Sequence, residues 1–166
     1  MELNLFKAGL NAEFQSCDVN DSYFLQEYLN INLSSKLSKW KKLASKVDFE
    51  DSEKLIFDLI LSLKEDIAKL ENHLLNQDKL LPLSQKGIID ALNFEYLNFL
   101  EPLLQKDKHY YMRFEINGQK MALFTLAQSE NLAKIIKIKA EDRILYDAFT
   151  VEIQRDMIRN RKENNE

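Results

Sequence analysis

The spacing of the apolar residues changes near Lys79, from a helical period before it to a period of two after it. Before Lys79, six apolar residues recur at alternating intervals of four and three, a spacing typical of the contact face of a coiled coil. These six residues are Ile56, Ile60, Leu63, Ile67, Leu70 and Leu74. After Lys79, apolar and polar side chains alternate along residues 109–116, which predicts a half-buried β-strand. The pattern predicts an α+β protein in which a helical segment precedes a small β-domain.

The first helix is predicted from the capping signal at residues 20–22, Asn-Asp-Ser, whose short side chains can accept hydrogen bonds from a helix N-terminus. Apolar residues then recur every three or four positions along residues 29–47, and lysines crowd the polar side. Residues 1–19 show no sustained period, and two alternatives stay open: an N-terminal segment that is partly flexible, or one that lies against another part of the protein.

The second helix follows a break at residues 48–52 and runs to about Asn76. Leu55 and Leu59 add to its apolar face and make that face wider than a two-stranded seam needs. Three arrangements stay open: a hairpin with the first helix, a bundle of several chains, or both. The six regularly spaced residues are the candidate oligomerisation residues, and we expect a homo-oligomer.

The β-domain is predicted to begin with a short strand at residues 79–83, where a proline favours an edge position or a strand start. Residues 84–87 are expected to turn, and residues 91–105 fit either a strand or an irregular loop. Asn117-Gly118 is the strongest local signal, because both residues tolerate the positive φ of a type I′ hairpin turn. Residues 132–139 supply a further strand.

A two-residue turn sets the register of the hairpin around Asn117-Gly118. The expected cross-strand pairs are Phe114–Met121, Met112–Leu123, Glu115–Lys120, Tyr111–Phe124 and His109–Leu126. Large apolar groups occur on both faces of this hairpin, so we expect other parts of the protein to cover each face.

A final helix is predicted from Glu141-Asp142 onward, acidic at its start and basic at its end in agreement with the helix dipole. Four of its residues form a stripe that can cover one face of the sheet: Leu145, Phe149, Ile153 and Met157. The β-branched residues within 148–153 also fit a strand, and this alternative stays open.

We therefore divide the chain into an N-terminal segment at 1–19, a helical oligomerisation segment at 20–77 and a β-domain with its C-terminal helix at 78–166. A formal charge of −4 argues against general affinity for nucleic acid. No apolar run approaches the roughly 18 residues that cross a membrane, and the N-terminus lacks a signal-peptide core. The single Cys17 cannot form an internal disulfide, which favours a reducing cytoplasm.

No catalytic constellation accompanies either half of the chain, so we expect a protein that is not an enzyme. His73 lies on or beside the helical seam and His109 on a strand, without the Cys or acidic neighbours that build a metal site. Cys17 has no His and Asn companions that would activate it. The sequence contains no P-loop, dinucleotide fingerprint or nucleophile elbow, and we expect neither a cofactor nor a metal.

Residues 83–87, Leu-Ser-Gln-Lys-Gly, resemble the D/N-x-S-x-x-G signature of PilZ domains. The resemblance covers residues 80–166 and includes the order of elements: signature turn, strands, NG hairpin, a further strand and a charged C-terminal helix. A helical heptad segment before the barrel resembles the atypical PilZ branch, whose members oligomerise through that helix. The resemblance implies a six-stranded antiparallel β-barrel and makes Ser84 and Gly87 candidate residues for binding cyclic di-GMP.

Two departures from the PilZ pattern disfavour cyclic di-GMP as a ligand. Pro82 replaces the acidic or amide residue of the signature, and no arginine precedes Arg113, so the R-x-x-x-R motif that belongs before the first strand is missing there. Arg155 and Arg159 match its letters but fall in the C-terminal helix. Arginine matters because its planar fork binds phosphate at two points and stacks on guanine, which lysine does not do. Ser84 and Gly87 then fit ordinary turn chemistry.

The sequence thus predicts a cytoplasmic bacterial adaptor that self-associates through its helices and docks a protein partner through a PilZ-like barrel. The resemblance implies work in flagellar or pilus motility or in surface behaviour. A cyclic di-GMP receptor with a remodelled pocket and a purely structural component of a larger motility complex are the two alternatives.

Overall fold

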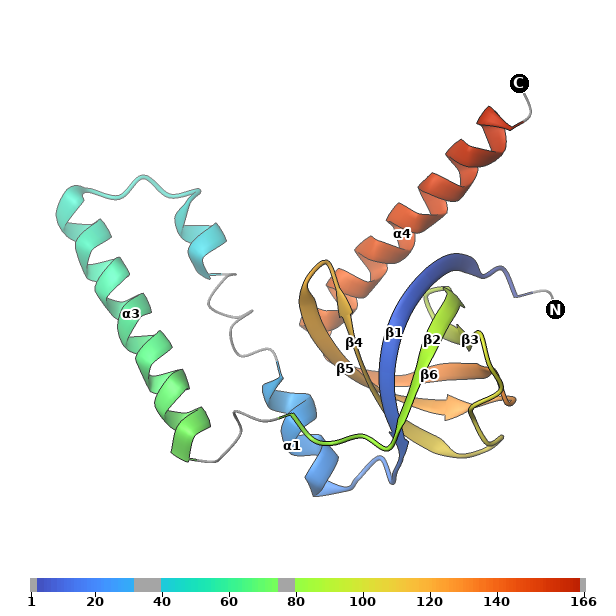
Figure 1. The fold of residues 1–166 in the computed structure, drawn as a ribbon. Coiled ribbons are helices and arrows are strands. Elements are labelled where there is room, and N and C mark those ends of the chain that lie inside the picture. Colours follow the sequence, from blue (N-terminus) through green and yellow to red (C-terminus); the bar gives the residue numbers. More distant parts are fainter. Residues whose placement is uncertain (1–2, 32–39, 75–79, 165–166) are drawn as a thin grey trace. The chain divides into compact units, whose positions relative to one another are not determined.

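The chain forms two compact units in the computed structural model, which describes residues 3–31, 40–74 and 80–164 (Figure 1). The barrel unit consists of residues 1–29 together with 82–166, and the helical unit consists of residues 30–81.

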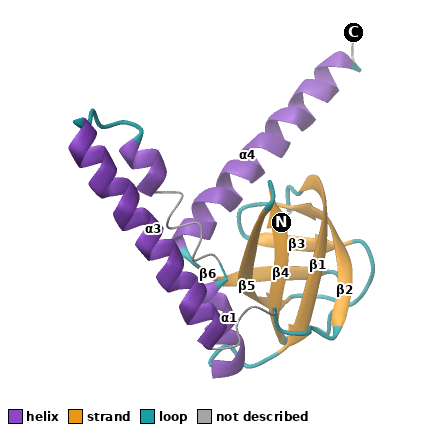
Figure 2. Ribbon diagram, turned by 60° about the vertical axis from the view of Figure 1, so that its left-hand side comes forward, coloured by secondary structure: helices purple, strands orange, loops and turns teal. Residues whose placement is uncertain are grey.

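The barrel unit is built on six antiparallel strands that close on themselves in the order β1-β2-β3-β6-β5-β4 (Figure 2). The strands are β1 (Phe6–Ser16), β2 (Gln85–Leu92), β3 (Tyr96–Phe99), β4 (His109–Ile116), β5 (Gln119–Ala127) and β6 (Leu132–Ile138). The described helices are α1 (Ser22–Asn30), α3 (Asp51–Leu74) and α4 (Ala140–Glu163). The prediction of an α+β protein with an antiparallel β-barrel is therefore confirmed.

Strand β1 is the first major difference from the sequence-based expectation, because it lies within the segment 1–19 that was predicted to lack regular structure. A period of two is present there: Phe6, Ala8, Leu10, Ala12 and Phe14 alternate with more polar or smaller residues. Two of the inward positions are alanines, which carry little apolar signal. The alternation is visible in the structure as alternating burial along the strand.

The helical unit is an insertion within the barrel and does not precede it. Residues 17–84 lie between β1 and β2, yet these strands are neighbours that pair antiparallel, with Phe14 opposite Gln85. The backbone N–H of Ser84 donates to the side-chain oxygen of Gln15 at 3.3 Å, which ties the two ends of the insertion together. The predicted order, helices first and barrel second, is wrong because β1 comes before the helices.

The β4–β5 hairpin matches its prediction at every expected pair, from His109–Leu126 to Glu115–Lys120. Asn117 and Gly118 both have positive φ, at 52° and 77°, as the type I′ turn requires. The predicted strand at 132–139 is also confirmed as β6. These elements were predictable because alternation and turn chemistry are local signals.

The region around β2 corrects two expectations. Residues 80–83 do not form a strand, and Lys79 lies outside the described residues. Residues 85–87, expected as part of a turn, begin strand β2. Within the ambiguous segment 91–105, the structure places the end of β2, the short strand β3 and then an irregular connection to β4.

Helix α4 confirms the helical alternative for residues 148–153 and covers the barrel as expected. Leu145, Phe149 and Ile153 pack against the core, and Met157 is half-buried. The Tyr146 hydroxyl donates to the carbonyl of Asn93 at 2.6 Å and fixes the helix to the β2–β3 turn. The C-terminal half of α4 extends beyond the strands (Figure 1).

The core fills the interior of the barrel. Its fully buried members include Phe14, Ile89, Leu97, Phe99, Met112, Met121 and Leu123. Side chains from β1 to β5 thus interdigitate inside a small barrel, as is usual for barrels with few strands.

The single first helix predicted within residues 20–47 corresponds to two separate described pieces. Helix α1 belongs to the barrel unit apart from its last residue, and its start is capped as predicted: the Tyr23 N–H donates to the Asp21 carboxylate at 3.0 Å. Residues 40–44 are helical and belong to the helical unit. Residues 32–39 of the prediction lie outside the described residues.

Candidate functional site

The apolar face of α3 is the first candidate site, and it is exposed. We call Ile56, Ile60, Leu63, Ile67 and Leu70 the α3 seam. The seam side chains and the adjacent Leu55 and Leu59 are between 53% and 72% exposed. Leu74, the sixth predicted oligomerisation residue, is the last residue of α3, and its side chain lies outside the described part. The spacing places the described seam residues along one side of a helix.

The start of α3 shows why the helix begins where it does. The side chain of Glu53 accepts a hydrogen bond from the backbone N–H of Glu50 at 3.2 Å, in the manner of a capping box. Asp51 and Glu53 also place negative charge in the first turn, which the helix dipole favours. The sequence predicted a break at residues 48–52, and α3 begins within it, at Asp51.

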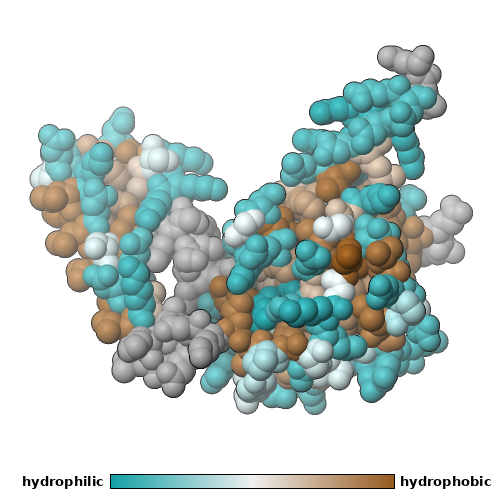
Figure 3. All heavy atoms as spheres, viewed as in Figure 1, coloured by the Kyte–Doolittle hydropathy of each residue, from teal (hydrophilic) through white to brown (hydrophobic). Residues whose placement is uncertain are grey.

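A different side of α3 is covered within the helical unit. Phe57, Leu61, Glu65 and Ala68 are only half-exposed and recur at helical spacing. The Phe57 ring stacks on the Phe49 ring with centroids 5.4 Å apart, and the Lys41 ammonium pairs with Glu65 at 2.8 Å. The contact with residues 40–44 therefore uses the side of α3 away from the seam. Figure 3 shows hydrophobic residues gathered along one border of the helical unit.

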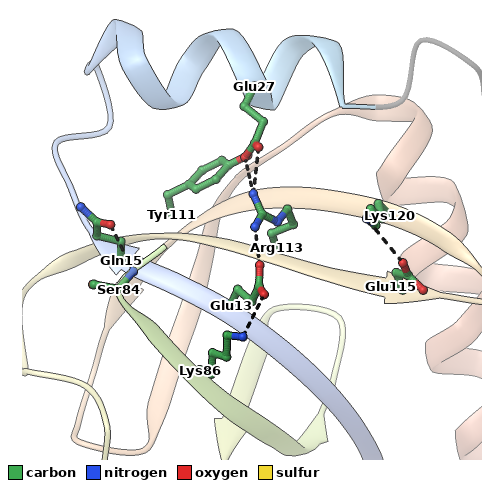
Figure 4. A network of polar contacts seen from close by, with 9 residues as sticks. All are labelled: Glu13, Gln15, Glu27, Ser84, Lys86, Tyr111, Arg113, Glu115 and Lys120. Atoms are coloured by element: carbon green, nitrogen blue, oxygen red, sulfur yellow. Dashed lines mark hydrogen bonds and ion pairs between the residues drawn. The ribbon is translucent and has the colours of Figure 1, made fainter. Parts of the chain in front are cut away.

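The second candidate is a cluster of charged residues on the outside of the barrel, drawn in Figure 4. Arg113 of β4 lies at its centre, and its guanidinium binds both carboxylate oxygens of Glu27 from α1, at 2.8 and 3.0 Å. The same guanidinium binds Glu13 of β1, which Lys86 of β2 also approaches at 3.7 Å. The Tyr111 hydroxyl donates to Glu27. The cluster joins α1 to three neighbouring strands.

The central ion pair of the cluster is buried, so loss of either partner alone is costly. The side chains of Arg113 and Glu27 are only 7% and 9% exposed, so their ion pair is largely removed from water. Burial alone would lower the pKa of Arg113, but the hydrogen bond to Glu13 and the charges of both glutamates raise it. Burial and the hydrogen bond to Glu27 raise the pKa of Tyr111 far above its usual value, so Tyr111 stays a neutral donor.

Aromatic contacts flank the cluster and complete the attachment of α1. The ring of Phe24 packs on Tyr111 with centroids 5.3 Å apart, and the ring of Tyr28 packs on Phe124 at 5.2 Å. The ammonium of Lys137 lies 5.6 Å from the centre of the Tyr28 ring. Helix α1 thus covers the outer face of the β4–β5 hairpin. The sequence predicted that this face is covered but did not identify the helix that covers it.

The predicted ligand residues Ser84 and Gly87 lie just before β2 and within it. Ser84 is exposed and lies just before β2, where its backbone N–H bonds to Gln15. Gly87 lies within β2 opposite Ala12, and a Cβ added there would lie 2.5 Å from Leu103 and 3.1 Å from Phe99. The interpretation of Gly87 as a turn residue is wrong, because Gly87 lies within β2. Close packing inside the barrel leaves no room for a Cβ at this position.

Three arginines that could contact a dinucleotide lie in β4 and α4. Arg113 is enclosed by Glu13 and Glu27, so its guanidinium is already bound on two sides. Arg155 and Arg159 are exposed on the distal part of α4. Among the described residues, no group of three or more His, Cys, Asp or Glu is arranged to hold a metal ion.

Sequence reasoning missed Glu27, Arg113 and Glu13 as a unit, because Arg113 lies far along the chain from both glutamates. The available signal was Arg113 itself, the first arginine of the chain, placed in a strand with large apolar groups on both faces. A buried guanidinium needs carboxylate partners. That requirement alone does not reveal which of the chain's acidic residues supply them.

In comparisons with known proteins, no family model, no curated protein and no solved structure matches the chain. The resemblance to PilZ domains therefore stays a prediction. Across residues 3–31, 40–74 and 80–164, no helix has both the length and the apolar composition needed to cross a bilayer.

Proposed function

We propose that this protein is a non-enzymatic adaptor that joins copies of itself through the α3 seam and presents its barrel unit to a partner protein. The observation that carries the proposal is the exposure of the α3 seam. Seven large apolar side chains of one helix, including the adjacent Leu55 and Leu59, are each more than half exposed.

Water makes such a face costly. Complete burial of one Leu or Ile side chain is worth about 1.5–3 kcal/mol, and contiguous exposed apolar patches on soluble proteins mark interaction sites. The intrachain contact through Phe57 and Glu65 leaves the seam exposed. A second protein surface is therefore the natural cover for the seam.

The barrel unit supports a docking role more than a ligand-binding role. Its interior is filled by fully buried side chains such as Phe14, Phe99 and Met112. On its outer surface, Ile88 and Leu100 are exposed neighbours, joined by a backbone hydrogen bond of 2.9 Å. These two residues, which we call the barrel patch, are the surface that we propose for partner contact.

The proposed setting, in flagellar or pilus motility or in surface behaviour of a bacterium, rests on the resemblance to PilZ domains alone. Cyclic di-GMP binding is not favoured, because Gly87 serves packing and Arg113 is bound by two glutamates. Calorimetry with cyclic di-GMP tests this point: saturable heat that Ser84→Ala abolishes would restore the receptor hypothesis.

Light scattering of the full chain tests self-association. Leu63→Asp combined with Leu70→Asp places two charges in the α3 seam and should reduce the particle mass to that of one chain, 19.6 kDa. Ser62→Asp combined with Lys69→Asp is the matched control, because both residues are exposed and each lies one position before a seam residue. A wild-type mass of one chain at high concentration would refute the proposal.

A further inference from the structure

In the part of the chain that the structure describes, the seam residues of α3 stay more than half exposed, and their residue types indicate what can bind there. Residues 40–44 and Phe49 contact α3 through Glu65 and Phe57, which lie outside the seam. In the heptad notation, Glu65 occupies position f, directly opposite the a and d positions of the seam. Phe57 occupies position e at the border of the seam, so a second helix can bind the seam without displacing the Lys41–Glu65 contact.

The distribution of Ile and Leu along the seam favours a parallel coiled coil of two helices. The intervals place Ile60 and Ile67 at a, and Leu63 and Leu70 at d. In parallel coiled coils, β-branched residues at a with Leu at d favour the two-stranded form over trimers and tetramers. Ile56, at a d position, is the one described seam residue that departs from this rule.

The flanking positions also distinguish the two orientations. In a parallel, in-register pair, Leu59 at g faces Lys64 at e of the other chain, whose methylene stem can cover the leucine. In the antiparallel register that pairs Ile60 with Leu70, the two copies of Lys64 face each other instead. Asp66 meets an acidic residue in either orientation and does not discriminate.

From these observations we infer that the α3 seam binds the α3 seam of a second copy of this chain in a parallel, in-register, two-stranded coiled coil. The inference rests on the proposed function and specifies its partner and geometry. Each α3 connects to its barrel unit through residues 75–84. Parallel pairing places these two connections at the same end of the coil, so both barrels can engage one partner and gain avidity.

Cysteine cross-linking of the full chain, with Cys17 replaced by serine, tests the orientation. Ile60→Cys should form a disulfide between copies on mild oxidation, because a position meets the same a position in a parallel pair. A mixture of Ile60→Cys and Leu70→Cys chains should form no mixed disulfide, because ten residues of helix separate these positions by about 15 Å. Ser62→Cys, exposed and outside the seam, is the matched control and should stay unlinked.

The outcomes separate this inference from the proposed function. A particle mass of twice 19.6 kDa with cross-linking of Ile60→Cys supports both. A mixed Ile60–Leu70 disulfide shows an antiparallel pair, and a mass of three or four chains shows the wrong stoichiometry; either result overturns the inference and leaves self-association intact. A mass of one chain overturns both.

Discussion

The barrel unit and the helical unit treat their apolar residues in opposite ways. Along β4 and β5, large apolar side chains are buried on both faces, inside by the core and outside by α1. Along α3, one side contacts Phe49 and Lys41, whereas the α3 seam is exposed. The difference indicates that the barrel unit completes its own packing, while the described helical unit leaves the α3 seam exposed; in the proposed function, a second copy covers it.

The largest expected effect tests whether the outer face of the barrel depends on its charged cluster. Arg113→Ala leaves the enclosed carboxylate of Glu27 without its guanidinium partner, and breaking such a buried pair typically costs about 3–5 kcal/mol. Denaturant unfolding followed by near-ultraviolet circular dichroism, which reports the barrel tyrosines, measures the loss.

Two further variants show whether the loss comes from burial of the charge. Lys120→Ala removes an exposed cross-strand pair with Glu115 and should cost no more than about 1 kcal/mol. Arg113→Met combined with Glu27→Met removes both buried charges and should recover much of the stability. Equal losses for Arg113→Ala and Lys120→Ala would show that the cluster is not a buried anchor.

The second effect tests whether only the helical unit depends on association. Trp40, the single tryptophan, lies in the helical unit, so its fluorescence follows that unit alone. A 100-fold dilution should weaken the helical unit by up to about 2.7 kcal/mol through mass action, while the barrel tyrosine signal keeps its midpoint. A Trp40 transition that is independent of concentration would show that the unit is complete in one chain.

The third effect tests the packing role assigned to Gly87. Gly87→Ala should destabilise the barrel unit by about 1–2 kcal/mol, because its Cβ would overlap Leu103 and crowd Phe99. Leu103→Ala in the same chain makes room for the new methyl group, so the two changes should be less than additive in a double-mutant cycle. Strict additivity would remove the packing explanation.

The smallest effect concerns pH. The hydrogen bond from Arg113 is the main cause that lowers the pKa of Glu13 below its ordinary value of 4.5. A carboxyl whose folded-state pKa is lowered stabilises the protein above that ordinary value, and the contribution disappears as pH falls through the lowered pKa. Glu13→Gln should therefore be less stable than the wild type at pH 7, by under about 1 kcal/mol because Glu13 is partly solvated. The difference in stability between the two proteins should vanish in acid. A difference that persists there would exclude the lowered pKa of Glu13 as its cause.

Local patterns predicted most of the individual elements, but they did not predict which distant segments pair with each other. The β4–β5 register followed from alternation and from Asn117-Gly118, all within one short stretch. The pairing of β1 with β2 joins residues on either side of the insertion, and no local signal shows that they meet. The contact of Glu27 with Arg113 depends on the same closure. The α3 seam was read correctly as a helical stripe, because periodicity needs only the helix itself.

The position of β1 ahead of the helical unit has a consequence for synthesis on the ribosome. Both of its neighbours, β2 and β4, are translated after the whole of α3. During that interval a strand with apolar inward positions has no partner, a situation that exposes nascent chains to aggregation. Under the proposed self-association, the exposed stripe of α3 meets its counterpart on an adjacent nascent chain of the same polysome. In that case the order of translation favours association of two growing chains before either barrel closes.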